Sequence, residues 1–192
     1  MRLLLGSLFV FVIATIVGLG GTYLALERGA AFGSLSIGTW KSWPKSGTVD
    51  ADPYARADIA RSGQLPIALG DGVAFFARAD DDGRPLSGRC DVVVSGMTPT
   101  SRFWTLTLYT PSGQLAANAI GRFGFTSQEV VRRADGSFSI AIGPRVTAGN
   151  WLPTGGVDRY VLYLRLYDTA VGVSTGAGRE VVMPIVKTAS CP

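Results

Sequence analysis

The sequence predicts a mainly β protein, in which one N-terminal transmembrane helix and a short second helix precede a jelly-roll-like antiparallel β-sandwich. Three observations predict this fold class: an uncharged apolar stretch at the N-terminus, alternation of apolar and polar residues from Val73 onward, and turn-forming Gly, Pro and Asp residues between the alternating segments. We expect a transmembrane anchor at residues 1–28, a linker at residues 29–51 and the sandwich domain at residues 52–192.

The predicted anchor covers residues 3–26, which contain no charged side chain. A helix of about 20 apolar residues is long enough to cross a membrane. The alternative is a cleaved secretory signal, whose apolar core is normally about 7–15 residues and ends at a small-residue cleavage site. Residues 23–26 (Tyr-Leu-Ala-Leu) lack such a site, so we favour an uncleaved anchor. Either reading exports the rest of the chain, and we expect a single-pass membrane protein whose C-terminal domain lies on the far side of the membrane.

The chain has two cysteines, Cys90 and Cys191. An even pair in an exported chain predicts a disulfide, which would hold the C-terminus. Two separate thiols are the alternative, and the export prediction favours the disulfide.

A short helix is predicted at residues 52–63, because Asp52 suits the N-cap, Pro53 the first turn and Gly63 the end. The preceding linker contains Trp40 and Trp43, which suit either the membrane interface or packing on the domain. The sequence leaves that choice open.

The predicted strands alternate apolar and polar residues and are separated by turn signals such as Asp82-Gly83 and Asp135-Gly136. Seven or eight antiparallel strands at this spacing indicate a β-sandwich. Pro184 places the last strand at a sheet edge. The strands occupy residues 73–78, 90–94, 102–109, 137–142, 160–167 and 180–185, with shorter candidates at 114–119 and 128–132.

Composition excludes several classes of function. The chain has no histidine, which excludes Ser-His-Asp and Cys-His catalysis and the usual zinc sites. The formal net charge of +4 is mild and no basic run occurs, so we expect no nucleic-acid partner. No metal or cofactor is expected either. The acidic segment at residues 80–83 lacks the spaced ligands of a calcium loop and is predicted to be a hairpin turn with exposed charge.

Four motifs follow in a characteristic order: an aromatic strand at residues 103–109, an Asp-Gly hairpin at 134–138, Asn-Trp-Leu-Pro at 150–153 and Arg-Leu-Tyr at 165–167. By these motifs the chain resembles the family catalogued as domain of unknown function number 1214, over roughly residues 73–186. The resemblance implies a jelly-roll sandwich and no particular activity. Residues 52–56 and 88–91 look like a short membrane-anchored alphaproteobacterial branch, without the companion domain numbered 1254 that longer relatives carry.

Two candidate ligand surfaces follow from these strands. Tyr163, Arg165 and Tyr167 share one face of their predicted strand, and Tyr109 lies on the similar face of the aromatic strand. If the two strands are neighbours, these side chains form one surface that suits a carboxylate or a glycan. An ordinary solvated sheet face is the simpler interpretation. Asn150 and Trp151 could hold a sugar in a loop. A Trp that closes one end of the sandwich, beside an Asn that caps a turn, is the favoured interpretation.

With the bacterial source that the resemblance implies, we expect a single-pass protein of the bacterial inner membrane with its C-terminal domain in the periplasm. The expected function is a binding or assembly module of the cell envelope. Its expected partners are inner-membrane lipid through the helix, a protein that carries the companion domain, and a glycan. The alternatives are an envelope carbohydrate-active enzyme and a structural protein without a ligand. The enzyme is disfavoured because the one pair of carboxylates that we considered, Asp158 and Asp168, would lie about 33 Å apart at the two ends of a strand.

Overall fold

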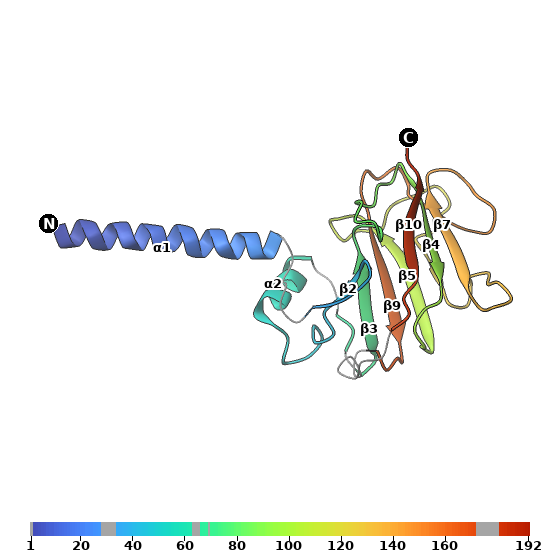
Figure 1. Ribbon diagram of the computed structural model, residues 1–192, viewed down its shortest axis with the longest axis horizontal. Helices are drawn as coiled ribbons and strands as arrows, with labels where there is room; N and C mark the ends of the chain where they lie inside the picture. The colour runs from blue at the N-terminus through green and yellow to red at the C-terminus, as the bar shows by residue number, and fades with distance from the viewer. Residues whose placement is uncertain (1, 28–33, 63–65, 69, 172–180) are drawn as a thin grey trace.

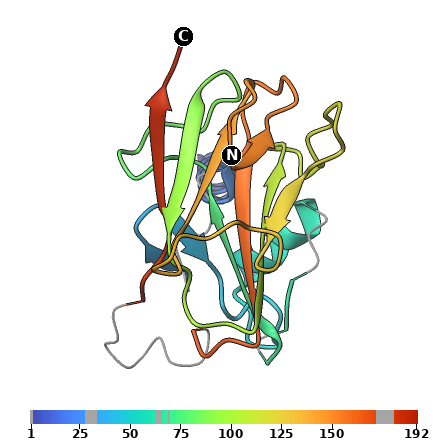
Figure 2. The same ribbon diagram turned by 90° about the vertical axis from the view of Figure 1, so that its right-hand side faces the viewer.

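The structure, a computed structural model, describes residues 2–27, 34–62, 66–68, 70–171 and 181–192. Two β-sheets lie face to face, and a long helix projects from one side of this sandwich (Figures 1 and 2). The mainly β fold with two sheets, a short helix and an apolar N-terminal helix is confirmed. Jelly-roll connectivity is not confirmed by the observed strand orders.

The six-stranded sheet is antiparallel throughout its described pairs. Its order is β1 (Leu35–Ile37), β2 (Trp40–Ser42), β3 (Gly72–Ala77), β9 (Val161–Tyr167), β5 (Phe103–Tyr109) and β6 (Gly124–Thr126). The first two strands fall inside residues 29–51, so the segment predicted to be a linker contributes one edge of the sandwich.

The second sheet has four strands in the order β10 (Ile185–Ser190), β4 (Asp91–Gly96), β7 (Phe138–Gly143) and β8 (Asn150–Pro153). β7 and β8 are parallel, which corrects the prediction of a wholly antiparallel sandwich. Parallel neighbours usually need a long crossover. Here residues 144–149 suffice, because Asn150 pairs with Ile140 and the chain therefore returns only part of the length of β7.

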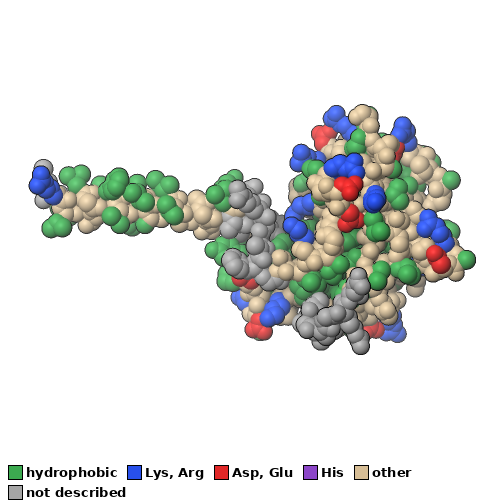
Figure 3. Space-filling view, viewed as in Figure 1, with side chains coloured by type: hydrophobic (Ala, Val, Ile, Leu, Met, Phe, Trp, Pro, Cys, Tyr) green, Lys and Arg blue, Asp and Glu red, His purple; other side chains and the backbone are tan. Residues whose placement is uncertain are grey.

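Both predicted helices are present. α1 (Arg2–Glu27) has no charged residue between its two terminal residues, and Figure 3 shows hydrophobic side chains along it and a basic one at its free end. Among the described residues, Arg2–Leu24 is the one helical stretch with the length and composition to cross a membrane, as a membrane anchor or a signal sequence would be. α2 (Pro53–Ser62) begins as predicted, since the Asp52 carboxylate accepts hydrogen bonds from the N–H groups of Tyr54 and Ala55. Gly63 lies outside the described residues.

The core lies between the sheets and consists of alternate residues from the longest strands, for example Leu164 of β9 and Ile140 of β7. Trp104 and Phe138 meet across the core with their ring centroids 5.0 Å apart. Trp40 also belongs to this core, and its indole N–H donates to the Pro184 carbonyl over 2.7 Å. Trp43 stacks on Phe76 outside the core. Both linker tryptophans therefore pack on the domain.

Several predicted strands differ from the observed ones. The last strand starts at Ile185 instead of residue 180, because Pro184 has no N–H to donate to a ladder. β10 is still an edge strand, as Pro184 suggested. Residues 114–119 and 128–132 form only isolated pairings, at Leu115 and Arg132. The strand in that region is the three-residue β6.

Candidate functional site

The predicted ligand residues separate into two groups. Tyr109, Tyr163, Arg165 and Tyr167 lie on β5 and β9, which are neighbours as the platform hypothesis required. Their side chains share the outer face of the six-stranded sheet, where Thr107 pairs with Tyr163 and Thr105 with Arg165. Asn150 and Trp151 lie on β8 of the other sheet and do not join them.

Asn150 and Trp151 serve their own sheet. The buried Asn150 amide accepts from the Val131 N–H and donates to the carbonyls of Val131 and Ser139, at 2.8, 2.8 and 3.0 Å. The Trp151 indole N–H donates to the Gly143 carbonyl over 3.2 Å. Both residues thus bond within the protein, but on a strand and not in the predicted loop, and the half-buried Trp151 lies outside the core cluster.

Four aromatic rings cross the outer face of the six-stranded sheet in the order Trp43, Phe76, Tyr163 and Tyr109, and we call them the aromatic row. Successive ring centroids are 5.2, 6.0 and 5.2 Å apart. The two central rings are nearly covered, since Phe76 is 6% exposed and Tyr163 is 7% exposed. The sequence did not single out Trp43 or Phe76 as site residues. The sequence does not show that Phe76 points outward, because it follows another phenylalanine and the strand has no apolar–polar alternation at that point.

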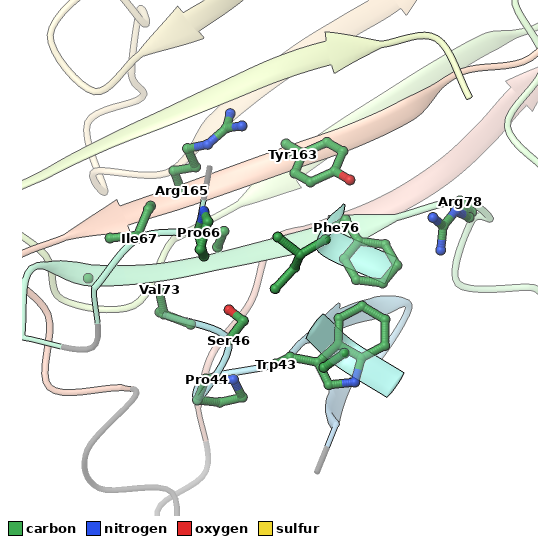
Figure 4. A pocket seen from close by; sticks show the side chains of 14 residues that line it. Trp43, Pro44, Ser46, Pro66, Ile67, Val73, Phe76, Arg78, Tyr163 and Arg165 are labelled. Carbon is green, nitrogen blue, oxygen red and sulfur yellow. The ribbon is translucent and has the colours of Figure 1, made fainter. Parts of the chain in front are cut away.

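A cleft opens between the aromatic row and the segment that includes α2, and we call it the α2 cleft (Figure 4). Its empty space, with the open mouth included, is about 730 Å³. The described residues that line it include two arginines and no Asp or Glu. They are Trp43, Pro44, Ser46, Ala55, Ile59, Pro66, Ile67, Gly72, Val73, Ala74, Phe76, Arg78, Tyr163 and Arg165.

Both arginines of the cleft rest on rings of the aromatic row. The guanidinium carbon of Arg165 lies 5.3 Å from the Tyr109 centroid and 5.2 Å from the Tyr163 centroid. That of Arg78 lies 4.7 Å from the Phe76 centroid. Such contacts hold a guanidinium by its flat face and leave its N–H edge available for other groups. Figure 4 shows the two arginines toward opposite ends of the Tyr163–Phe76 floor.

Within the described part of the chain, neither guanidinium of the cleft has an ion pair or a hydrogen bond. This distinguishes them from four arginines elsewhere that contact aspartates, namely Arg84, Arg89, Arg102 and Arg145. The cleft therefore presents positive charge and N–H donors beside an apolar floor. An anion is the group that this arrangement can bind.

Comparison with known proteins places the sandwich in a family. Residues 71–171 match the family described as "Protein of unknown function (DUF1214)". The chain belongs to this family. The matched range contains β3, β5 and β9 and thus most of the floor of the α2 cleft. Trp43 and α2 lie before it. A search among curated proteins finds no match.

Two solved structures share features of the DUF1214 chain. The VPA0106 protein from Vibrio parahaemolyticus superposes with a TM-score of 0.61 at 20% identity, over 90% of this chain and 43% of that protein. An uncharacterized protein from Burkholderia cenocepacia gives a TM-score of 0.44 at 16% identity, over 93% of this chain and 52% of that protein. The chain spans less than half of the Vibrio protein, and the likeness to it shows the fold alone.

The acidic turn of this DUF1214 chain is structural. Asp81 and Asp82 are exposed, as expected of a turn with exposed charge, but Asp80 is buried, which corrects the prediction at that residue. Its carboxylate accepts from the Thr188 hydroxyl over 2.7 Å and from the Arg84 N–H over 2.8 Å, while Asp81 accepts from the Val186 N–H. These bonds join the turn to β10. Among the described residues, no three His, Cys, Asp or Glu side chains gather where a metal could bind.

The predicted disulfide is present in the structure, between Cys90 and Cys191. Cys90 directly precedes β4 and Cys191 directly follows β10, and these strands are paired with Asp91 opposite Ser190. The bridge therefore closes one end of the β4–β10 ladder and stands away from the α2 cleft.

Proposed function

We propose that this DUF1214 protein is a binding module of the bacterial cell envelope. In this proposal α1 anchors it in the inner membrane, the sandwich stands in the periplasm, and the α2 cleft holds the ligand. The observation that carries the proposal is the pair of aromatic-supported arginines, Arg78 and Arg165, in a cleft without a carboxylate among its described lining residues. If this were an ordinary solvated sheet face, there would be no need for covered aromatic rings beside these two arginines.

The same lining favours binding over catalysis. Hydrolysis of glycosides usually needs two carboxylates that flank the scissile bond. The described lining of the α2 cleft contains neither Asp nor Glu, and the chain contains no histidine to act as a base. We therefore rank the envelope carbohydrate-active enzyme second and a ligand-free structural protein third.

The partner in an assembly role would be a protein that carries the companion domain 1254. The Vibrio protein is more than twice as long as the part that matches this chain, so sandwiches of this shape occur with a further region. A protein that carries such a region is therefore the partner to look for. The Ala74→Phe test below distinguishes partner binding in the cleft from partner binding elsewhere.

Filling the cleft tests the proposal. Ala74 pairs with Arg165 and lines the cleft, so Ala74→Phe places a ring in the space that a ligand would occupy. The matched control is Ala141→Phe, which adds the same ring to the outer face of the other sheet, opposite Val93. Both full-length variants and the wild type are purified from membranes in mild detergent, and bound lipids, glycans and proteins are identified by mass spectrometry.

We expect a component that co-purifies with the wild type and with Ala141→Phe and falls at least tenfold with Ala74→Phe. Circular dichroism of each variant verifies that the sandwich is intact. If all three chains carry the same components, the α2 cleft is not the binding site and the proposed function is wrong.

A further inference from the structure

We propose that the ligand of the α2 cleft is an anionic lipid of the membrane that holds α1, with its phosphate against the guanidinium edge of Arg165. This inference rests on the proposed binding function and names the ligand class. It follows from three features of the cleft: the sign of its charge, the chemistry of its walls and its position in the molecule.

The charge of the cleft selects an anion. Its charged described side chains are Arg78 and Arg165, and no described residue neutralises either of them. The planar N–H edge of a guanidinium fits the paired oxygens of a phosphate or carboxylate. Lys41 adds a further exposed cation on the same sheet face, opposite Phe76. A neutral ligand would leave these donors without an acceptor.

The walls of the cleft suit hydrocarbon more than sugar. Pro44, Ile59, Pro66, Ile67 and Val73 contribute apolar surface around the arginines. A sugar normally stacks on an open aromatic face. Here the rings of Phe76 and Tyr163 are each more than nine-tenths covered, and neighbouring rings and the two guanidinium groups already contact them. An apolar chain with one acidic end matches both the walls and the charge.

The position of the cleft brings it to the source of such a ligand. α2 forms one wall through Ala55 and Ile59, and α2 contacts α1. Figure 1 shows α2 beside the C-terminal end of α1, between that helix and the six-stranded sheet. A helix that spans the bilayer ends at the head groups. Cations that lie close to the head groups are attracted to anionic lipid.

The test uses the full-length protein in an uncharged detergent and native mass spectrometry. The probes are phosphatidylglycerol and phosphatidylcholine with the same acyl chains, and glycerol phosphate as the head group without chains. The variant is Arg165→Gln. Its matched control is Arg159→Gln, an exposed arginine just before β9 that does not line the cleft. Lipid bound only around α1 is common to all of these chains and cancels in the comparison.

We expect the wild type and Arg159→Gln to retain phosphatidylglycerol at least tenfold better than phosphatidylcholine, and Arg165→Gln to lose most of that preference. Arg78→Gln reduces it less, because Arg78 lies at the other end of the floor. Glycerol phosphate competes at least tenfold more weakly than the lipid, because it leaves the apolar walls uncovered.

Three results would overturn the lipid assignment: no preference in the wild type, an unchanged preference in Arg165→Gln, or glycerol phosphate that competes as well as the lipid. The last result would assign the cleft to a soluble phosphate. The proposed binding function fails separately. A glycan or protein that is lost from Ala74→Phe, with no preference for phosphatidylglycerol, would refute the lipid and leave the binding module standing.

Discussion

At the scale of single residues, Asp80 shows how a charge is stabilised inside this sandwich. Its side chain has no exposed surface, and Arg84 lies 3.1 Å from it. Burial alone would raise the pKa of the Asp80 carboxyl. The hydrogen bonds from Thr188 and from the Arg84 backbone, together with the Arg84 charge, outweigh burial and hold the pKa below its ordinary value. The carboxylate is therefore the form that the fold stabilises.

We predict that Asp80→Asn lowers the free energy of unfolding by about 2–4 kcal/mol at neutral pH, because an amide cannot accept all these bonds. Since the pKa is lower in the folded state, the contribution of Asp80 is complete well above the ordinary value of 3.8 and is lost as pH falls through the folded pKa. Urea unfolding at pH 7 and pH 3 should show a smaller difference in the variant than in the wild type. Asp82→Asn, at an exposed carboxylate of the same turn, is the control.

At the scale of elements, β10 is held by contacts with segments that lie far from it in the sequence. It pairs with β4, donates hydrogen bonds to the carboxylates of the acidic turn, and follows Pro184, whose carbonyl accepts from Trp40. Beyond its last residue Ser190, the disulfide ties Cys191 to the start of β4. An edge strand with one neighbour has few ladder bonds of its own. The bridge is therefore expected to contribute much of its stability.

We predict that reduction of the Cys90–Cys191 bridge lowers the free energy of unfolding by about 2–4 kcal/mol, since the bridge closes a loop with a sequence separation of 101 residues. Thermal unfolding with and without reductant measures the effect, and a Cys90→Ala/Cys191→Ala double variant should not respond to reductant. In cells, a maleimide should label these thiols only after reduction. Labelling without reduction would contradict both the bridge and export to the periplasm.

Strand prediction from the sequence succeeds where a strand is long and has one buried face. β5 alternates buried residues such as Leu106 with half-exposed ones such as Thr105, so its period is visible. β6 has three residues and only one of them, Phe125, is buried, so the strand is too short to show alternation. β8 is a short segment that contains Pro153, so its sequence suggests a loop. It becomes a strand only because the fold places it beside β7. Local pattern thus predicts the sandwich and misses its short edges.

The candidate site is predictable only in part for a related reason. Arg165 and Tyr163 are visible as the outward residues of one alternating strand. Trp43 comes from a Gly- and Ser-rich segment far away in the chain, and only the folded structure stacks it on Phe76. That no carboxylate among the described residues pairs with Arg165 is likewise a property of packing. The composition does not reveal this, because the chain has 14 Asp and Glu residues and any of them could have paired with Arg165.

At the scale of the whole molecule, the two sheets have different surroundings. α1 and α2 lie on the side of the six-stranded sheet, and the four-stranded sheet forms the opposite side (Figure 1). If α1 spans the membrane, the outer face of the six-stranded sheet is turned toward the lipid. Two exposed lysines report on the two faces: Lys41 points outward from β2, and Lys187 points outward from β10.

We predict that a fluorophore at Lys41→Cys is quenched more strongly than one at Lys187→Cys when the full-length protein is placed in nanodiscs with head-group spin-labelled lipid. The described cysteines are both in the disulfide, so each variant offers one reactive thiol. Unlabelled nanodiscs supply the reference intensity, and both variants lose the same charge. Equal quenching would mean that the two sheet faces are not held at different distances from the bilayer, and a lipid in the α2 cleft would then have to reach it without a fixed orientation. Stronger quenching at Lys187 would put the cleft on the side away from the membrane and remove the positional support for a lipid ligand.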